Sequence, residues 1–394
     1  MQNYSSLYTK MAENLVLTNI YLDYQASTPL DKRVLDEMLP YMTTEFGNPH
    51  SSEHSFGWKA NNAVENAKES ISSYIDALSD EIIFTSGATE ANNLAIVGIG
   101  YAALEKSERR TILVSSIEHK CVLGAARFLE RFGFNVKKIP VLADGKIDLN
   151  SLAQLLKDDV LLVSVMATNN EIGVNQDLSV IGNLCKQHGV IFHVDAAQGG
   201  YANINVIENN IDLMSLSAHK IYGPKGIGVL YINQALDIKP LPIIHGGGQQ
   251  DGYRSGTLPV YLAVGMAKAI NLISELKEAE KQRIITLRNK MLDGLKAIVP
   301  ELKVNGTMED RHPGNINIML PHKDARQLIL SVQPNLAFST GSACTSGIQE
   351  PSHVLKAIGL STTEAEQSFR MTIGRFTNEG DVTTALQILS EKLK

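Results

Sequence analysis

The chain has 394 residues, of which 44% are apolar and 20% charged, and its formal net charge is −6. This length predicts at least two domains, and the composition excludes a disordered or fibrous protein. An acidic chain lacks the broad basic field of a nucleic-acid-binding protein, so we expect no direct nucleic-acid partner. No apolar run reaches the roughly 18 residues that a membrane helix needs, so we expect no membrane partner either.

The three cysteines, Cys121, Cys185 and Cys344, have no spacing typical of a disulfide framework or a zinc site. Together with an N-terminus that lacks a signal or transit pattern, this predicts a flexible N-terminal arm and a cytoplasmic protein. Cys121 and Cys185 lie in helix-like patterns and are predicted to be small buried apolar residues. Cys344 lies in FSTGSACTSG, whose small polar residues predict an exposed, flexible loop with a reactive thiol.

Short apolar runs alternate with helix-length amphipathic stretches up to about residue 260. We predict buried strands over Glu81–Thr85, Thr111–Ser115, Val160–Val165, Val190–Asp195, Asp212–Ser217 and Gly228–Ile232. Helical patterns lie between them, over Ala88–Leu104, Ala153–Lys157 and Leu178–His188. Apolar strands separated by helices predict a mostly parallel sheet covered on both faces, which is an α/β architecture.

Beyond the glycine-rich stretch at 245–256 the pattern changes. Residues 260–298 read as one long helix, apolar at first and then strongly charged. Short strand-like segments follow, and then helices over Ser352–Ala357 and Asp381–Lys392. This part is predicted to form a smaller α+β domain.

Polar residues follow two of the predicted strands, where ligands of open parallel sheets bind. Asp195 ends VIFHVD, and His219 and Lys220 follow DLMSLS. Asp195 alone could be a helix cap. Burial, however, lowers the pKa of a lysine and makes its amine nucleophilic toward carbonyls. A carboxylate for a pyridinium nitrogen and an amine for an aldehyde are what pyridoxal phosphate requires.

A phosphate site is predicted where TSGATEANN opens a helix. Small residues there expose backbone N–H groups at the positive helix end, and Thr89 adds a hydroxyl. The alternative is an ordinary capping box from Ser86 to Glu90. Ser217 and His219, after a neighbouring strand, favour the phosphate site.

His119 follows one further strand, and Asn169 and Asn170 follow another. Each alone is compatible with a structural histidine or an Asn-Asn turn. Polar groups at five strand ends favour a functional site on a rigid sheet.

These features occur within a series of longer motifs: YLDYQASTP, GNPHSSEHSFG, FTSGATEANNLA, IEHKCVL, NNEIGVNQDL, HVDAAQ, SAHKIYGPKGIG, HGGGQQDGYRSGTLP and STGSACTSG. In that order they resemble the pyridoxal-phosphate-dependent cysteine desulfurases of the IscS/NifS type, in the class V aminotransferase family. The resemblance runs from about Tyr21 to the C-terminus. It implies fold type I, with a seven-stranded, mostly parallel sheet in a large domain at 27–270. A small domain at 1–26 and 271–394 would carry the Cys344 loop.

The resemblance also implies residue roles. Lys220 would hold the cofactor through an imine, Asp195 would pair with its pyridine nitrogen, and Gln198 would bond the ring hydroxyl. His119 would stack on the ring and move protons, and Asn170 would contact the ring hydroxyl or the substrate. Further cofactor contacts would come from Ala88, Thr89, Ser217, His219 and, from the second subunit of a homodimer, Thr257. Arg370 would bind the substrate carboxylate.

The reaction implied is the conversion of L-cysteine to L-alanine, with the sulfur taken by Cys344 as a persulfide. An acceptor protein would then receive it, for iron–sulfur cluster assembly, tRNA thiolation or DNA phosphorothioation. The chain ends soon after its last predicted helix, without the extension of housekeeping members, which leaves the acceptor open. Alternatives are a selenocysteine lyase, an aminotransferase or a non-catalytic sulfur carrier. No metal site is expected.

Overall fold

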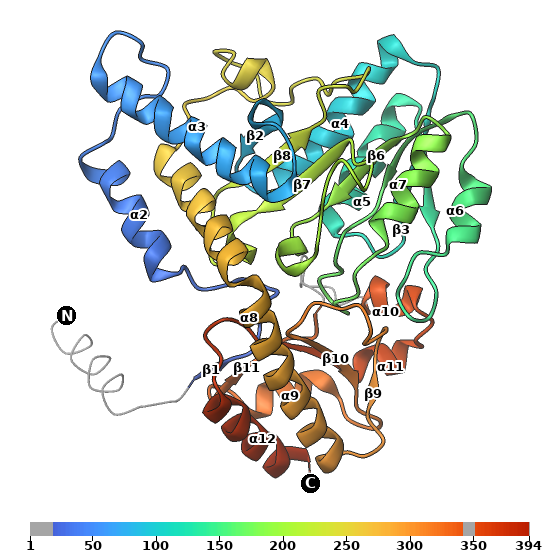
Figure 1. Ribbon diagram of the computed structural model, residues 1–394. Helices are drawn as coiled ribbons and strands as arrows, with labels where there is room; N and C mark the ends of the chain where they lie inside the picture. Colours follow the sequence, from blue (N-terminus) through green and yellow to red (C-terminus); the bar gives the residue numbers. More distant parts are fainter. Residues whose placement is uncertain (1–18, 342–350, 394) are drawn as a thin grey trace, which may run out of the picture.

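The computed structural model describes residues 19–341 and 351–393. Both Cys344 and the predicted N-terminal arm lie outside these ranges. A large sheet covered by helices forms one part of the molecule, and smaller sheets form the other, with helix α8 (Val260–Ile298) running from one part to the other (Figure 1). In the described part of the chain, no helix is both long and apolar enough to cross a membrane.

The large sheet has seven strands in the order β2-β8-β7-β6-β5-β3-β4. Their bounds are β2 (Ile82–Thr85), β3 (Thr111–Ser115), β4 (Asn135–Ile139), β5 (Val160–Ser164), β6 (Ile191–Asp195), β7 (Leu213–Ser217) and β8 (Gly228–Ile232). Neighbours from β7 to β4 pair in parallel, whereas β8 is antiparallel to both β2 and β7. The predicted seven-stranded, mostly parallel sheet is therefore confirmed.

Six strands were predicted to within one residue at each end because each is buried along its whole length. Strand β4 was not predicted individually. It lies at the sheet edge, and exposed Lys137 and Lys138 interrupt its apolar pattern.

Helices pack on the large sheet between its strands: α4 (Ala88–Lys106), α5 (Lys120–Leu129), α6 (Leu149–Leu155) and α7 (Leu178–Gln187). The prediction of Ala153–Lys157 for α6 was wrong by one turn. The Asp148 carboxylate accepts hydrogen bonds from the N–H groups of Asn150 and Ser151, and this cap starts the helix earlier. Two further helices, α2 (Lys32–Thr43) and α3 (Ser55–Ile75), were not predicted and pack against α8.

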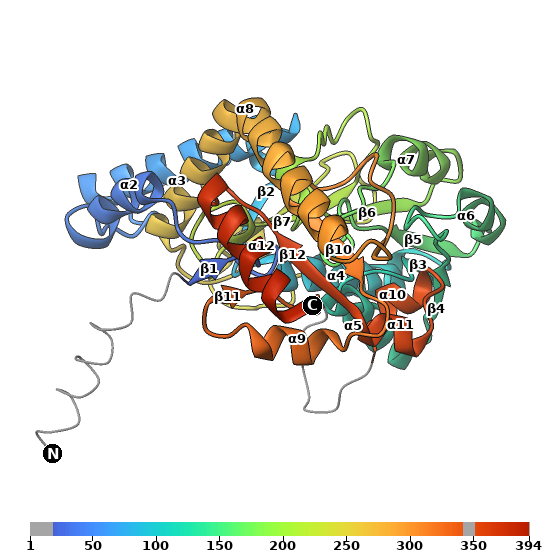
Figure 2. The ribbon, with the colours of Figure 1, turned by 90° about the horizontal axis from the view of Figure 1, so that it is seen from below.

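The smaller part combines both ends of the described chain. Its three-stranded sheet places β10 (Asn315–Met319) between β12 (Ser368–Thr372) and β9 (Lys303–Val304), all antiparallel. Strand β1 (Ile20–Tyr21) pairs in parallel with β11 (Leu336–Ala337), so the N-terminal segment joins this part. The helices here are α9 (Ala325–Ser331), α10 (His353–Ala357), α11 (Thr362–Glu366) and α12 (Glu379–Leu393), and α12 lies beside α8 (Figure 2). The boundary at residue 270 stays a prediction, and it falls within the continuous helix α8.

Candidate active site

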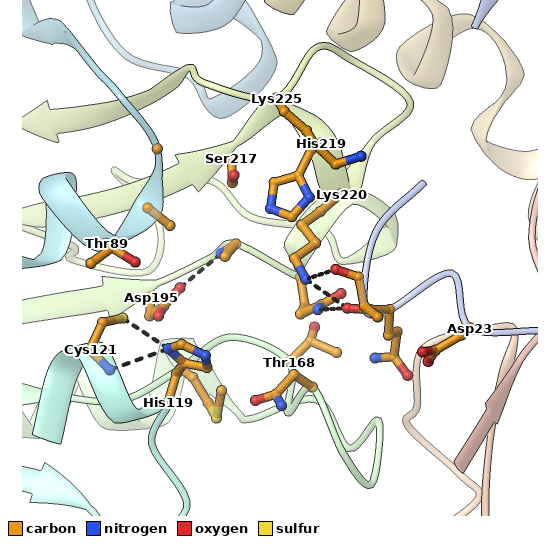
Figure 3. A pocket seen from close by; sticks show the side chains of 18 of the residues that line it. Asp23, Thr89, His119, Cys121, Thr168, Asp195, Ser217, His219, Lys220 and Lys225 are labelled. Atoms are coloured by element: carbon orange, nitrogen blue, oxygen red, sulfur yellow. Dashed lines mark hydrogen bonds between the residues drawn. The ribbon is translucent and has the colours of Figure 1, made fainter. Parts of the chain in front are cut away.

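The carboxyl ends of β6 and β7 meet the N-terminal segment and the smaller part around a cavity of about 730 Å³ (Figure 3). Most of the residues singled out from the sequence line it: Ala88, Thr89, His119, Asn170, Asp195, Gln198, Ser217, His219, Lys220 and Arg370. Thr257 does not line the cavity and is exposed. Cys344 lies outside the described residues.

Lys220 follows β7 in a single 3₁₀ turn, Ala218–Lys220, that ends inside the cavity. Its Nζ donates to the carbonyl oxygens of Gln25 at 2.7 Å and Ala26 at 2.8 Å. Burial lowers the pKa of this amine to about 8; Arg370 also lowers the pKa, while Asp23 and Asp195 oppose the shift. Lys220 therefore reaches its neutral, nucleophilic form more easily than an exposed lysine does.

Asp195 ends β6 and is only 4% exposed. Its Oδ1 accepts from the Ala197 N–H at 2.9 Å, and its Oδ2 accepts from Asn92 Nδ2, on α4, at 2.8 Å. None of the ion pairs between described residues includes Asp195. A buried carboxylate without a cationic partner favours a cationic ligand beside it.

Helix α4 opens at the cavity without a side-chain cap, and its N-cap residue is Gly87, with φ of +147°. A Cβ on Gly228 of β8 would lie 2.8 Å from the Gly87 Cα, so the absent side chain lets the strand approach this turn. Only half of the alternative capping box forms: the Ser86 N–H donates to Glu90 at 2.8 Å, but no side chain caps the first N–H groups of α4. The first-turn N–H groups of α4 thus form the positive end of a helix at the cavity.

Ser217 and His219 lie at this end of the cavity, near Lys225 (Figure 3). Burial lowers the pKa of His219 to about 4, and Lys220 and Lys225 add to the effect. Its Nδ1 lies 3.2 Å from Ser27 Oγ. A neutral His219, a hydroxyl and an uncapped helix end together form a donor set for a phosphate.

Arg370, on β12, reaches the cavity from the smaller part of the molecule. Its guanidinium donates to Asp23 Oδ1 at 2.6 Å, to Ser339 Oγ at 3.1 Å and to the Asn170 carbonyl oxygen at 2.5 Å. Its buried Nε has no partner in the described part of the chain. The residue lines the cavity, and a guanidinium there can bind a carboxylate.

His119 caps helix α5, because its Nδ1 accepts from the backbone N–H of Cys121 at 3.3 Å. The prediction that Cys121 is a small buried apolar residue is confirmed only in part, because Cys121 packs against the apolar core but is half-buried and also lines the cavity. Cys121 Sγ lies 3.0 Å from His119 Nδ1 and accepts from Asn92 Nδ2 at 3.2 Å. Cys185, by contrast, is fully buried in α7, as predicted.

Three residues around the cavity were missed from the sequence: Asp23, Gln25 and Asn92. The Gln25 carbonyl oxygen accepts from both Gln198 Nε2, at 2.8 Å, and Lys220 Nζ. Asp23 and Gln25 lie within the YLDYQASTP motif, and Asn92 lies within TSGATEANN. These motifs were noted, but nothing in them indicated that their side chains and carbonyls would lie against Arg370, Lys220 and Asp195.

The chain is similar to known proteins over nearly its whole length. The profile of the aminotransferase class-V family matches residues 20–384. A protein of Rickettsia typhi named cysteine desulfurase IscS is 49% identical over 382 residues, which are 97% of this chain and 92% of the relative. The counterpart from Rickettsia bellii is 48% identical over 381 residues, which are 96% of this chain and 92% of that one.

Solved structures agree with this relationship. One titled NifS-like protein superposes with a TM-score of 0.88 at 32% identity, covering 95% of this chain and 99% of the other. Another, titled SspA in complex with cysteine, has a TM-score of 0.80 at 36% identity, covering 91% and 99%. The chain therefore belongs to the aminotransferase class-V family and, within it, to the pyridoxal-phosphate-dependent cysteine desulfurases of the IscS/NifS type.

Proposed function

We propose that this chain converts L-cysteine to L-alanine and takes up the released sulfur on Cys344 as a persulfide. The observation that supports this most is a single cavity in which the amine of Lys220, the carboxylate of Asp195 and the guanidinium of Arg370 come together. The solved SspA structure, titled as a complex with cysteine, supports the same substrate here.

The residues of the cavity fit pyridoxal phosphate. Asp195 offers an unpaired carboxylate to the pyridine nitrogen, and Gln198 a side chain to the ring hydroxyl. The uncapped first turn of α4, with Ala88 and Thr89, would hold the phosphate together with Ser217 and His219. When bound, the cofactor supplies the electron sink that acidifies the proton on the substrate Cα.

Lys220 and His119 would move protons in this site. Lys220 has a pKa of about 8, so its amine can take up the Cα proton near neutral pH and return it. Burial lowers the pKa of His119, to which Lys220 adds, and this keeps its ring neutral. Neutral imidazole can both donate and accept a proton, which suits a residue at the reacting end of the cavity.

Arg370 would orient the substrate through its carboxylate. The guanidinium is held on one side by Asp23 and Ser339 and on the other by the Asn170 carbonyl, so its position is fixed before the substrate arrives. Asn170 also lines the cavity and is proposed to contact the ring hydroxyl or the substrate.

The proposed assembly is a homodimer in which Thr257 completes the phosphate site of the other subunit. Two observations support it: Thr257 is exposed away from its own cavity, and large apolar side chains are exposed on and between α2 and α3. These side chains are Leu35, Leu39, Met42, Phe46, Phe56 and Trp58.

Mixed dimers test the arrangement. With Lys220→Ala in one subunit and Thr257→Ala in the other, one site should keep wild-type cofactor affinity. With both substitutions in one subunit, no intact site should remain.

The proposed location is the cytoplasm, and the proposed partner is a protein that accepts the Cys344 sulfur. Acceptors from iron–sulfur assembly, tRNA thiolation and DNA phosphorothioation can be compared by incubating each with the labelled persulfide enzyme. The acceptor that removes the label fastest identifies the pathway.

The function is tested by incubating the purified protein with L-cysteine and a thiol reductant and measuring alanine and sulfide. We expect both products from the wild type and from Cys185→Ala, and neither from Lys220→Ala or Cys344→Ala. Undiminished release of alanine and sulfide by Cys344→Ala would overturn the persulfide and favour a lyase, whereas cysteine consumed without either product would favour an aminotransferase. Inactive wild-type protein that also fails to bind the cofactor would leave only a sulfur carrier.

A further inference from the structure

A chain of hydrogen bonds behind the cavity begins at Ser215 on β7. Ser215 Oγ donates to Asn92 Oδ1 at 2.5 Å, and both residues are fully buried. Asn92 Nδ2 then donates to Asp195 Oδ2 at 2.8 Å and to Cys121 Sγ at 3.2 Å. The Asn92 amide has only this orientation, because turning it over would place its oxygen against the carboxylate of Asp195.

The series of hydrogen bonds ends at the ring of His119 (Figure 3). His119 Nδ1 accepts from the backbone N–H of Cys121, and an accepting ring nitrogen carries no proton. Cys121 Sγ lies 3.0 Å from the same nitrogen. Because Asn92 approaches the sulfur as a donor, the thiol proton is free to point toward Nδ1. The proton of a neutral His119 ring must then lie on Nε2, on the side of the ring away from Cys121.

The charge states agree with this geometry. Burial, together with Asp195, raises the pKa of the Cys121 thiol to about 12, so the S–H proton is present at neutral pH. Burial lowers the pKa of His119, to which Lys220, His353 and Lys120 add and which Asp195 opposes. Both partners are therefore neutral, and the thiol is the donor of the pair.

We propose that Cys121 and Asn92 are positioning residues that hold neutral His119 with its proton on Nε2. The amide of Asn92 orients the carboxylate of Asp195 directly and His119 through the thiol of Cys121, so one buried side chain sets two residues with proposed cofactor contacts. In the reaction, His119 would then first act as a hydrogen-bond donor to the cavity. This consequence rests on the proposed function, whereas the tautomer does not.

The tautomer can be measured by nitrogen NMR of full-length protein labelled at its 10 histidines. His119→Gln identifies the signals of His119. In the wild type we expect the chemical shift of an unprotonated nitrogen at Nδ1 and of a protonated one at Nε2, both without cofactor and with it. In Cys121→Ala the hydrogen bond from the thiol to Nδ1 is lost. The fraction of His119 rings that carry their proton on Nδ1 should therefore rise by about three- to tenfold. Asn92→Ala should shift it in the same direction.

Two further variants separate this role from simple packing. Cys121→Ser keeps a donor and should return the tautomer ratio toward the wild-type value, whereas Cys185→Ala should leave it unchanged. A wild-type His119 protonated on Nδ1, or an unchanged ratio in Cys121→Ala, would overturn the proposal. The tautomer is measured without substrate, so a wrong tautomer would overturn this proposal and leave the desulfurase reaction untouched. An inactive enzyme would overturn the proposed function and leave the tautomer untouched. If both proposals hold, Cys121→Ala should lower kcat for L-cysteine and leave KM unchanged.

Discussion

The cavity has two walls that are built in different ways. The sheet wall consists of strand ends and the first turn of α4. Its main charged groups are Asp195 and Lys220, and neither takes part in an ion pair with another described residue. The opposite wall comes from the N-terminal segment and the smaller part, where Arg370 is already paired with Asp23. The sheet wall thus offers charged groups without ion-pair partners, and hydrogen-bond donors, to a bound cofactor. The opposite wall offers a neutralised pair that a substrate carboxylate can join.

Lys220→Ala removes the amine of the sheet wall and should have the largest effect on activity. Without the amine we expect alanine production to fall by at least about 1000-fold, because both the covalent attachment and the proton transfer are lost. The absorption of the cofactor imine should also be absent. Measurement of alanine release and of the absorption spectrum after incubation with cofactor tests this. A Lys220→Ala protein that keeps the imine spectrum would place the attachment on another residue.

Arg370→Met should damage the opposite wall alone. Removing a charge-assisted hydrogen bond to the substrate should raise KM for L-cysteine by about 10- to 100-fold. Cofactor affinity should change little. Arg370→Lys serves as the matched control, and it should recover only part of the affinity because it keeps the charge but loses the guanidinium fork. Equal losses of cofactor and cysteine affinity in Arg370→Met would contradict the division between the walls.

Ser217→Ala should weaken cofactor binding by about tenfold, since one hydrogen bond to a phosphate is lost. KM for L-cysteine, measured at saturating cofactor, should stay unchanged. Ser274→Ala is the control, because Ser274 does not line the cavity and its hydroxyl donates to the Ile270 carbonyl oxygen within α8. Equilibrium titration of each cofactor-free variant gives its cofactor affinity, and an effect of Ser274→Ala as large as that of Ser217→Ala would argue against the assigned phosphate end.

The smallest effect concerns the charge that each wall exerts on Lys220. In cofactor-free protein, labelling of Lys220 by an amine reagent should rise through a midpoint at about pH 8, because only the neutral amine reacts. Asp23 raises the pKa of Lys220 and Arg370 lowers it. The midpoint should therefore fall in Asp23→Asn and rise in Arg370→Met. Peptide mass mapping across pH measures it, and shifts of the same sign in both variants would contradict the opposite wall as a charge pair.

The two walls also differ in how far the sequence predicts them. Asp195 and Ser217 end strands that are buried along their whole length, and Lys220 follows one of them, so the apolar runs indicate where these polar side chains lie. Asp23 contacts Arg370 across 347 positions of the chain, and no local pattern reports such a contact. The sequence does not distinguish Asn92 from other residues of its helix, because its partners Asp195 and Ser215 lie on β6 and β7.

The residues of the opposite wall were therefore found only in part. Arg370 was identified through the family resemblance, whereas its partner Asp23 required the fold. The predicted role of Cys344 stays a prediction, because that residue lies outside the described ranges.

The most direct test of the account is a single turnover with L-cysteine carrying isotopically labelled sulfur, without reductant. The protein is then digested, and the masses of its cysteine-containing peptides are measured by mass spectrometry. The account predicts one labelled sulfur on the peptide of Cys344, none on those of Cys121 or Cys185, and one alanine released per sulfur bound. Alanine formed without label on Cys344, or label on Cys121 in its place, would contradict it.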